Sequence, residues 1–240
     1  MKKHLYDIFA DKWIHNGKVY LYSDPHFGDI ESYIFRNFID EEDISSEETI
    51  KRLDEMQINN INSTIQKDDT IIFLGDIGDI DCIKKIKGHK VLLLGNHDSG
   101  ASNYKREYNE VYDNSNMTTK DVTELYFAYA IRDIKKEKKI IRKYTKVYDN
   151  HLFDEVYEGP LMISDRIILS HEPIPVEDYM INIHGHRHDL SFDYDSKKQH
   201  YNVCAEAIKY KPICLTDLIK QGILKDIPTI HRFTIDKRND

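Results

Sequence analysis

Residues 70–79 decide the fold, and they read TIIFLGDIGD. The run from Thr70 to Leu74 predicts a buried strand, and Gly75 and Asp76 follow it directly. Further apolar runs at 18–23, 90–94, 166–170 and 181–184 also end beside polar residues. Open α/β sheets carry their sites at such strand ends, and glycine lets the backbone turn sharply there. The sequence therefore predicts a site assembled at the carboxyl ends of several strands.

The polar residues at these strand ends can each present a nitrogen or a hard oxygen to a divalent metal. They fall in five motifs, namely DPH at 24–26, GDIGD at 75–79, GNHD at 95–98, a lone histidine at 171 and GHRH at 185–188. The candidate ligands are Asp24, His26, Asp76, Asn96, His171, His186 and His188. Such a set is too large for one ion but suits two, if one carboxylate bridges them. Two metals about 3.5–4 Å apart can clamp the attacking and leaving oxygens of a displacement at phosphorus.

The bulk composition agrees with a single domain that needs no disulfide. The chain has 240 residues, of which 40% are hydrophobic, and its three cysteines form no C-x-x-C pair. No apolar stretch of about 18 residues occurs, so we expect no membrane contact and a cytoplasmic protein. The net charge of −8 argues against nucleic-acid binding through a broad basic surface. An anionic substrate is still compatible, because two divalent cations would reverse the local charge.

The remaining elements are predicted from capping residues and periodicity. The pair Ser45 and Glu48 forms a capping box that opens a helix to about residue 66, and residues 79–87 predict a short helix. Residues 161–164 and 166–170 predict a hairpin, and residues 201–204 and 229–235 are further strand candidates. Early β-α-β alternation followed by a strand-rich half suggests two packed sheets with helices outside.

Residues 101–160 allow two interpretations. Asp121 and Glu124 could cap a helix over 121–148 with one basic face, or a hairpin could run over 140–157 and turn at 149–150. The segment from Arg132 to Lys146 holds eight basic and two acidic residues, a net charge of +6. We favour a solvated helix face over a nucleic-acid surface for this segment.

The five motifs, taken in order, strongly resemble the calcineurin-like metallophosphoesterases. The resemblance covers about Val19 to Asn202, and the text around LSHEP at 169–173 and HGHRH at 184–188 is similar to the small bacterial and phage members. It implies a metallo-dependent phosphatase fold of class α/β or α+β, a four-layer α/β/β/α sandwich of two mixed β-sheets flanked by helices. We expect residues 1–240 to form one such domain, with an inserted helical or hairpin segment at about 115–158.

The resemblance also implies roles for the site residues. One metal would be held by Asp24, His26, Asp76 and His188, and the other by Asp76, Asn96, His171 and His186, so that Asp76 bridges. A hydroxide between the metals would be the nucleophile. His97 would be the general acid, and Asp79 would pair with it. Asp98 would brace the loop, while Asn96 and Arg187 are the candidate contacts to substrate.

The expected function is a dinuclear metal-dependent phosphodiesterase acting on a nucleotide or a nucleic-acid-derived phosphoester. Mixed imidazole and carboxylate ligands suit Mn, Fe, Zn, Co or Ni, of which we favour Mn. A phosphomonoesterase, acting on a nucleotide or a protein, and a non-catalytic metal-binding scaffold are the alternatives. The motifs lack the further Arg-Gly pair of the protein Ser/Thr phosphatases and the tyrosine ligand of the purple acid phosphatases. Homo-oligomers are compatible with the sequence.

Overall fold

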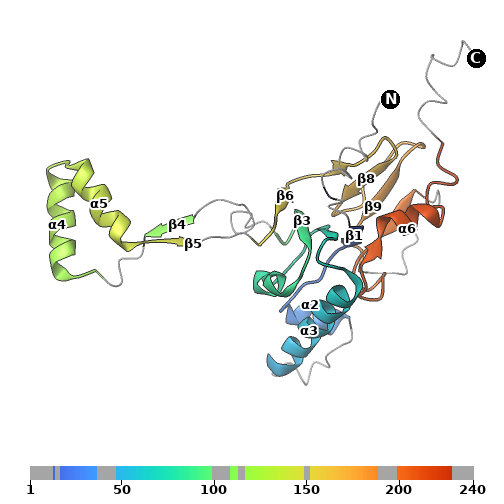
Figure 1. Ribbon diagram of the computed structural model, residues 1–240, viewed down its shortest axis with the longest axis horizontal. Coiled ribbons are helices and arrows are strands. Elements are labelled where there is room, and N and C mark those ends of the chain that lie inside the picture. The colour runs from blue at the N-terminus through green and yellow to red at the C-terminus, as the bar shows by residue number, and fades with distance from the viewer. Residues whose placement is uncertain are drawn as a thin grey trace, which may run out of the picture. The chain divides into compact units, whose positions relative to one another are not determined.

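A computed structural model gives the structure of the chain, and it describes residues 13, 17–36, 47–98, 109–112, 117–148, 152–188 and 199–228 (Figure 1). The chain divides into two compact units. The main unit comprises residues 1–101 and 152–240, and the inserted unit comprises residues 102–151. Two predicted features, the capping residue Ser45 and the strand at 229–235, lie outside the described residues.

The main unit is built on a five-stranded sheet in the order β11-β1-β2-β3-β6. The strands are β1 (Val19–Tyr22), β2 (Thr70–Phe73), β3 (His89–Leu93), β6 (Glu155–Tyr157) and β11 (Ile213–Cys214). All neighbours are parallel except β11, which pairs with β1 in the antiparallel sense. Strands β1 and β2 are buried along their whole length, which explains their uninterrupted apolar sequence.

A second sheet of four strands has the order β10-β9-β8-β7. Its strands are β7 (Leu161–Met162), β8 (Ile167–Ser170), β9 (Ile181–His184) and β10 (His200–Asn202). Strands β8, β9 and β10 run parallel, while β7 and β8 are antiparallel. The hairpin predicted around residue 165 is therefore confirmed.

The two sheets share one hydrophobic core. Alternate residues of β1, β2 and β3 join alternate residues of β8 and β9 in a single buried cluster that also contains Trp13. Leu21, Leu74 and Leu169 in this cluster have no exposed surface. Burial of such side chains between two sheet faces contributes roughly 1.5–3 kcal/mol for each residue, and it fixes the strand register.

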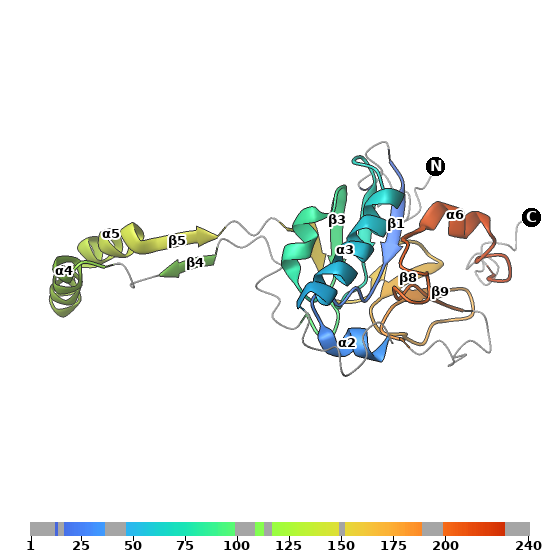
Figure 2. The same ribbon diagram turned by 90° about the horizontal axis from the view of Figure 1, so that it is seen from below.

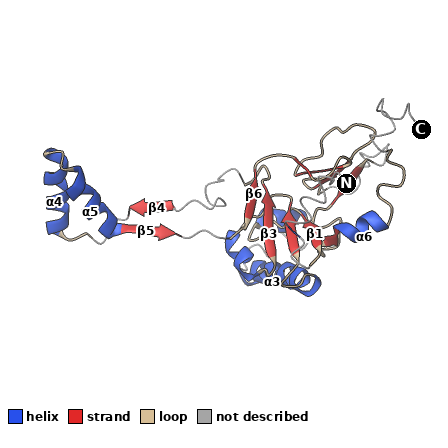
Figure 3. Ribbon diagram, turned by 45° about the horizontal axis from the view of Figure 1, so that its top comes forward, coloured by secondary structure: helices blue, strands red, loops and turns tan. Residues whose placement is uncertain are grey.

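Helices flank the sheets, as Figures 2 and 3 show. They are α2 (Ile30–Phe35), α3 (Glu47–Thr64), the 3-10 helix η2 (Ile80–Lys85) and α6 (Leu215–Lys220). Helix α3 covers the outer face of β1, where the Tyr22 hydroxyl donates a 2.8 Å hydrogen bond to Gln57 Oε1. The predicted fold class is confirmed, since two mixed sheets are flanked by helices. Among the described helices, none is long and apolar enough to cross a membrane.

The inserted unit differs from both interpretations of its sequence. Its elements are β4 (Asn109–Tyr112), α4 (Thr119–Ala130), α5 (Ile134–Tyr144) and β5 (Thr145–Tyr148), with β4 and β5 antiparallel. A continuous helix over 121–148 is wrong because Arg132 adopts a left-handed φ of 56° and the Asp133 N–H bonds to Ala128 O at 2.8 Å, ending α4. The hairpin over 140–157 is also wrong, because β5 pairs with β4 and β6 pairs with β3.

The predicted basic face is divided between α5 and β5 in this structure. Two lysines of α5 form ion pairs with α4, from Lys143 to Asp121 at 3.1 Å and from Lys136 to Glu124 at 3.7 Å. These pairs are exposed, so each contributes little to stability.

Leu169→Ala tests the core between the sheets. Removing a fully buried leucine should lower the free energy of unfolding by about 2–5 kcal/mol, because a cavity is left behind. Urea unfolding followed by fluorescence measures this, since Trp13 is the single tryptophan and lies in the same core. The control is Met162→Ala on β7, where 43% of the residue is exposed and a change within about 0.5 kcal/mol is expected. Equal losses in the two variants would contradict the assignment of this core.

Candidate metal centre

The candidate ligands lie just past the carboxyl ends of strands in both sheets, as predicted. Asp24 follows β1, Asp76 follows β2 and Asn96 follows β3 in the first sheet. His171 follows β8 and His186 follows β9 in the second sheet. Parallel strands end at the same sheet edge, so these loops converge. Residues far apart in the sequence thereby reach one place.

The backbone at this edge is turned by residues in the left-handed region. The φ angles are 56° at Asp24, 46° at His26, 53° at Asp76 and 66° at His186. Such angles cost of order 1–3 kcal/mol each and persist only where the surroundings hold them, and Asp, Asn and His tolerate them best among L residues. Backbone hydrogen bonds hold two of these turns, because Asp24 N donates to Gly75 O and His26 N donates to Asp76 O, each at 3.1 Å.

Two glycines allow the loops to touch. A Cβ atom at Gly95 would overlap the Asp76 carboxylate and backbone, and one at Gly185 would overlap the side chains of Ser23 and Asp24. Glycine at these positions is therefore a requirement of packing. Gly95 lets the loops after β2 and β3 meet closely, and Gly185 does the same for the loops after β1 and β9 of the two sheets.

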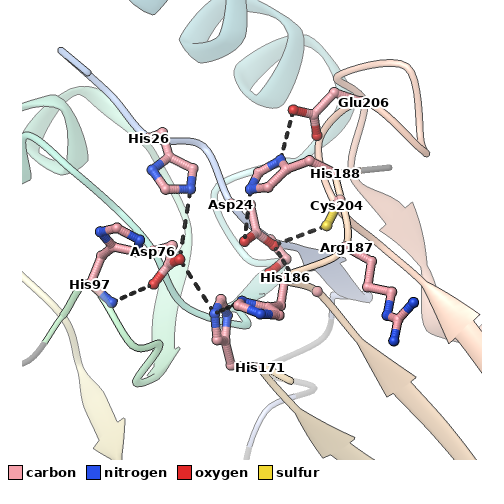
Figure 4. Close-up of polar contacts among 12 residues, drawn as sticks. Asp24, His26, Asp76, His97, His171, His186, Arg187, His188, Cys204 and Glu206 are labelled. Atoms are coloured by element: carbon pink, nitrogen blue, oxygen red, sulfur yellow. Dashed lines mark hydrogen bonds and ion pairs between the residues drawn. The ribbon is translucent and has the colours of Figure 1, made fainter. Parts of the chain in front are cut away.

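The side chains form two groups whose ligand atoms lie within 4.8 Å of one another. Asp24, His26 and His188 form one group, and Asp76, His171 and His186 form the other. Asp76 lies between them, because its Oδ2 is 3.3 Å from His171 Nε2 and 3.7 Å from His26 Nε2. Figure 4 shows both carboxylates surrounded by the imidazoles. Asn96 joins the second group through its Oδ1, which lies 2.7 Å from His171 Nε2.

The burial of the two carboxylates and the presence of unsatisfied polar atoms make this arrangement suitable for binding cations. Asp24 and Asp76 are 0% and 1% exposed. Among the described residues, buried Asp24 Oδ1 and His26 Nε2 have no hydrogen-bond partner, an arrangement that proteins avoid unless an ion or water completes it. Burial also lowers the pKa of His26, which keeps its imidazole neutral and able to donate a lone pair. The donor set of carboxylate oxygens and imidazole nitrogens suits transition metals.

His171 is oriented by the backbone. Its Nδ1 lies 2.7 Å from Leu74 O, so Nδ1–H donates to the carbonyl and Nε2 is directed at Asp76 and Asn96. Burial opposes the charged form, but the Asp76 carboxylate outweighs burial and raises the pKa of His171 to about 9. A cation that binds to His171 Nε2 would therefore have to displace this proton.

Arg36 and Glu206 support the site and were not predicted from the sequence. Glu206 Oε1 lies 2.9 Å from His188 Nδ1 and forms an ion pair with Arg36 Nε. Burial would raise the pKa of Glu206, but His188 and Arg36 outweigh it and hold the pKa below its usual value. Arg36 also donates to Asp24 O at 2.6 Å and to Pro25 O at 3.1 Å. The guanidinium thus holds the Asp24 turn and, through Glu206, the orientation of His188.

Cys204 makes a polar contact with the site that was not predicted from the sequence. Its Sγ donates to Asp24 Oδ2 at 3.2 Å, and burial together with the Asp24 charge raises the pKa of the thiol. The protonated thiol is thus a hydrogen-bond donor to Asp24, and its sulfur also lies within 4.8 Å of possible ligand atoms of His188 and Glu206. The expectation that site residues lie at the ends of strands could have identified Cys204 and Glu206, because both follow β10.

His97, Asp79 and Arg187 take up different positions around the carboxylates. The His97 backbone donates to Asp76 Oδ1 at 2.9 Å, and its ring centroid lies 5.4 Å from that of His26. The Asp79 carboxylate instead caps η2 by accepting from Asp81 N at 2.9 Å. Within the described residues it makes no ion pair with His97, in contrast to the arrangement that the resemblance implies. Figure 4 shows the Arg187 side chain directed away from the carboxylates.

Asp98 braces the loops, as predicted. Its carboxylate accepts hydrogen bonds from the backbone N–H groups of Asp76 at 2.8 Å, Ile77 at 3.1 Å and Gly95 at 2.9 Å. One buried side chain therefore ties the loop after β2 to the loop after β3.

The fold and the site define a metal-dependent phosphoesterase, which is a hydrolase. The sequence profile of the calcineurin-like phosphoesterase family matches residues 17–208, and the chain belongs to that family. The resemblance inferred from the five motifs is thus confirmed. A crystal structure of a protein of unknown function from Aquifex aeolicus is similar at 19% sequence identity, covering 85% of this chain and 98% of that chain, with a TM-score of 0.48. The comparison with curated proteins finds no match.

Asp98→Ala tests the bracing of the loops. The variant leaves two buried N–H groups and the part-buried N–H of Gly95 without an acceptor, and each buried group costs about 1–3 kcal/mol. We therefore expect a loss of at least ~3 kcal/mol in the free energy of unfolding, measured with urea and Trp13 fluorescence. Asp79→Ala is the matched control, since it removes an exposed cap with an expected loss of about 1 kcal/mol. Similar losses in both variants would refute the bracing role.

Proposed function

We propose that this protein is a dinuclear metal-dependent phosphodiesterase acting on a nucleotide or a nucleic-acid-derived phosphoester. The observation that carries the proposal is the convergence of two buried carboxylates with imidazoles in two groups that meet at Asp76. A structural role would be the default for each residue alone. Two buried carboxylates facing several imidazole nitrogens are far harder to explain without cations.

The proposed ligands follow the two groups. Asp24, His26, Asp76 and His188 would hold one ion, and Asp76, Asn96, His171 and His186 would hold the other. When bound, two such ions would neutralise charge on a phosphoester and lower the pKa of water toward about 7. Mn is the favoured metal among Mn, Fe, Zn, Co and Ni. The neutral amide of Asn96 would keep the site cationic enough to attract an anionic ester.

His97 is the proposed general acid. Its backbone is anchored to Asp76 Oδ1, while its side chain is exposed, so a ring nitrogen can approach a leaving oxygen. A histidine is suited to give up a proton near neutral pH, and a positioned acid contributes about 10²–10⁴-fold. Asp79 would assist only if its carboxylate left the cap of η2 and approached the His97 ring.

The preference for a diester rests on this acid. A general acid matters most when the leaving alcohol is poor, which is the usual case for phosphodiesters of sugars. A phosphomonoesterase on the same ligands is the second candidate, and relative kcat/KM on matched mono- and diesters separates the two. Arg187 is less favoured as a substrate contact, because its side chain is directed away from the carboxylates.

The first test of the proposed function is metal dependence. Hydrolysis of bis(p-nitrophenyl) phosphate should require added Mn and stop after chelation. Asp76→Asn should lower the rate by more than ~100-fold, since loss of a mere supporting partner of a ligand already costs about 10–100-fold. Asp81→Asn, an exposed carboxylate paired with Lys84 on η2, should leave the rate unchanged. Full activity after chelation would refute the proposal, and metal binding without turnover of any phosphoester would favour the scaffold alternative.

The second test concerns His97→Ala and the leaving group. The variant should bind metal with unchanged stoichiometry, measured by elemental analysis. Its kcat should fall by about 10²–10⁴-fold for a diester with an alkyl leaving group, and much less for a p-nitrophenyl diester, which needs no acid. Equal losses on both esters, or loss of metal, would exclude His97 as the proton donor.

A further inference from the structure

A pocket of about 220 Å³ adjoins the metal centre in the main unit. Two of the proposed ligands, Asn96 and His171, form part of its wall. The rest comes from the ends of β3 and β6 in one sheet and from the loop after β8 in the other. One substituent of a phosphorus placed at Asn96 and His171 would therefore lie beside this pocket.

Hydrogen bonds fix both sides of the pocket. On one side, Leu94 N donates to Tyr157 O at 2.9 Å, which holds the segment that begins at Glu158 beside the end of β3. On the other side, the fully buried Asn182 accepts from Ile174 N at 3.0 Å and donates to Ser170 Oγ at 2.8 Å. The pocket is thus preformed, which lowers the ordering cost of binding.

The lining selects a chemical class of ligand. Leu94, Pro160 and Ile174 offer apolar surface, and Glu158 and Glu172 supply carboxylates. Among the described residues that line the pocket, none is a lysine or an arginine. Carboxylates accept hydrogen bonds from hydroxyl and amino groups, and they repel a further phosphate at close range.

We infer that this pocket binds the uncharged, ring-bearing ester substituent of the substrate, such as a nucleoside, and excludes substituents that carry another phosphate. The inference rests on the proposed function, because it takes the phosphoryl group to lie at the adjoining ligands. The apolar walls receive the ring, and Glu158 and Glu172 accept from its hydroxyl or amino groups. These two glutamates are specificity-determining residues, outside the predicted ligand set.

Gly159 offers a direct test because a Cβ atom there meets no heavy atom within 4 Å. Gly159→Phe should therefore narrow the pocket without disturbing the fold, and Gly159→Ala is the matched control. The substrates are two p-nitrophenyl diesters with the same leaving group, one of thymidine 5′-phosphate and one of methyl phosphate. For wild type, the thymidine ester should have the higher kcat/KM by about tenfold or more. Gly159→Phe should raise KM for the thymidine ester by a similar factor and leave the methyl ester within about twofold.

The charge selection is tested with a third ester, the thymidine compound carrying an added 3′-phosphate. Wild type should discriminate against it, and Glu172→Gln should raise its kcat/KM by about threefold to tenfold while changing the thymidine ester little. Glu177→Gln, an exposed glutamate outside the pocket, should change neither ester. Equal effects of Gly159→Phe on the thymidine and methyl esters, or no effect of Glu172→Gln on discrimination, would overturn the inference.

Failure of the proposed function would look different. If wild type with Mn hydrolyses none of the esters, the function fails, and the pocket is then tested by calorimetric binding of the same compounds. Tighter binding of the thymidine ester than of the methyl ester, lost in Gly159→Phe and kept in Gly159→Ala, would support the pocket without catalysis. Equal affinities would reject it.

Discussion

Charge compensation around two buried carboxylates is the constraint on which this site depends. Asp24 and Asp76 lie out of contact with solvent, where an unpaired charge would cost several kcal/mol. Imidazoles, a thiol proton and backbone N–H groups surround these carboxylates, and within the described part of the chain Asp24 Oδ1 has no hydrogen-bond donor. Protonated His171 supplies part of the positive charge beside Asp76. Bound cations would complete the charge balance that these side chains leave incomplete.

Arg36 shows how the surroundings of the site extend this balance. Its guanidinium is almost fully buried and bonds to the Asp24 turn and to Glu206. One cation therefore compensates a carboxylate that orients His188 and also fixes a left-handed turn that carries Asp24. Support and orientation are combined in one side chain, so the short helix α2, which ends just before Arg36, belongs to the site as much as the sheet edge does.

Structural features that depend on short motifs and periodicity can be predicted from the sequence. Features that depend on contacts between residues far apart in the sequence cannot. Apolar runs beside glycines identify β1, β2 and β3 and the ligands after them, because strand ends and turn chemistry are local. Arg36 and Glu206 meet only in the folded chain, so no local pattern indicates their pairing. The break between α4 and α5 also escapes prediction, because it occurs at Arg132, a residue type that rarely adopts a left-handed φ. The pairing of β5 with β4 depends on a strand before the helices that carries no distinctive pattern.

The left-handed turns at Asp24, His26, Asp76 and His186 have a consequence for how such motifs persist in evolution. Aspartate and histidine are favoured at these positions for two reasons. They are candidate metal ligands, and few other side chains tolerate a left-handed backbone conformation. A related protein that had lost its catalytic activity would still be under selection to retain these residues, because they fit the backbone conformation. Retention of the DPH, GD and GHRH motifs in a related sequence is therefore weak evidence that this sequence encodes an active enzyme. Loss of His97, whose φ is not constrained in this way, would indicate loss of catalytic activity more sensitively.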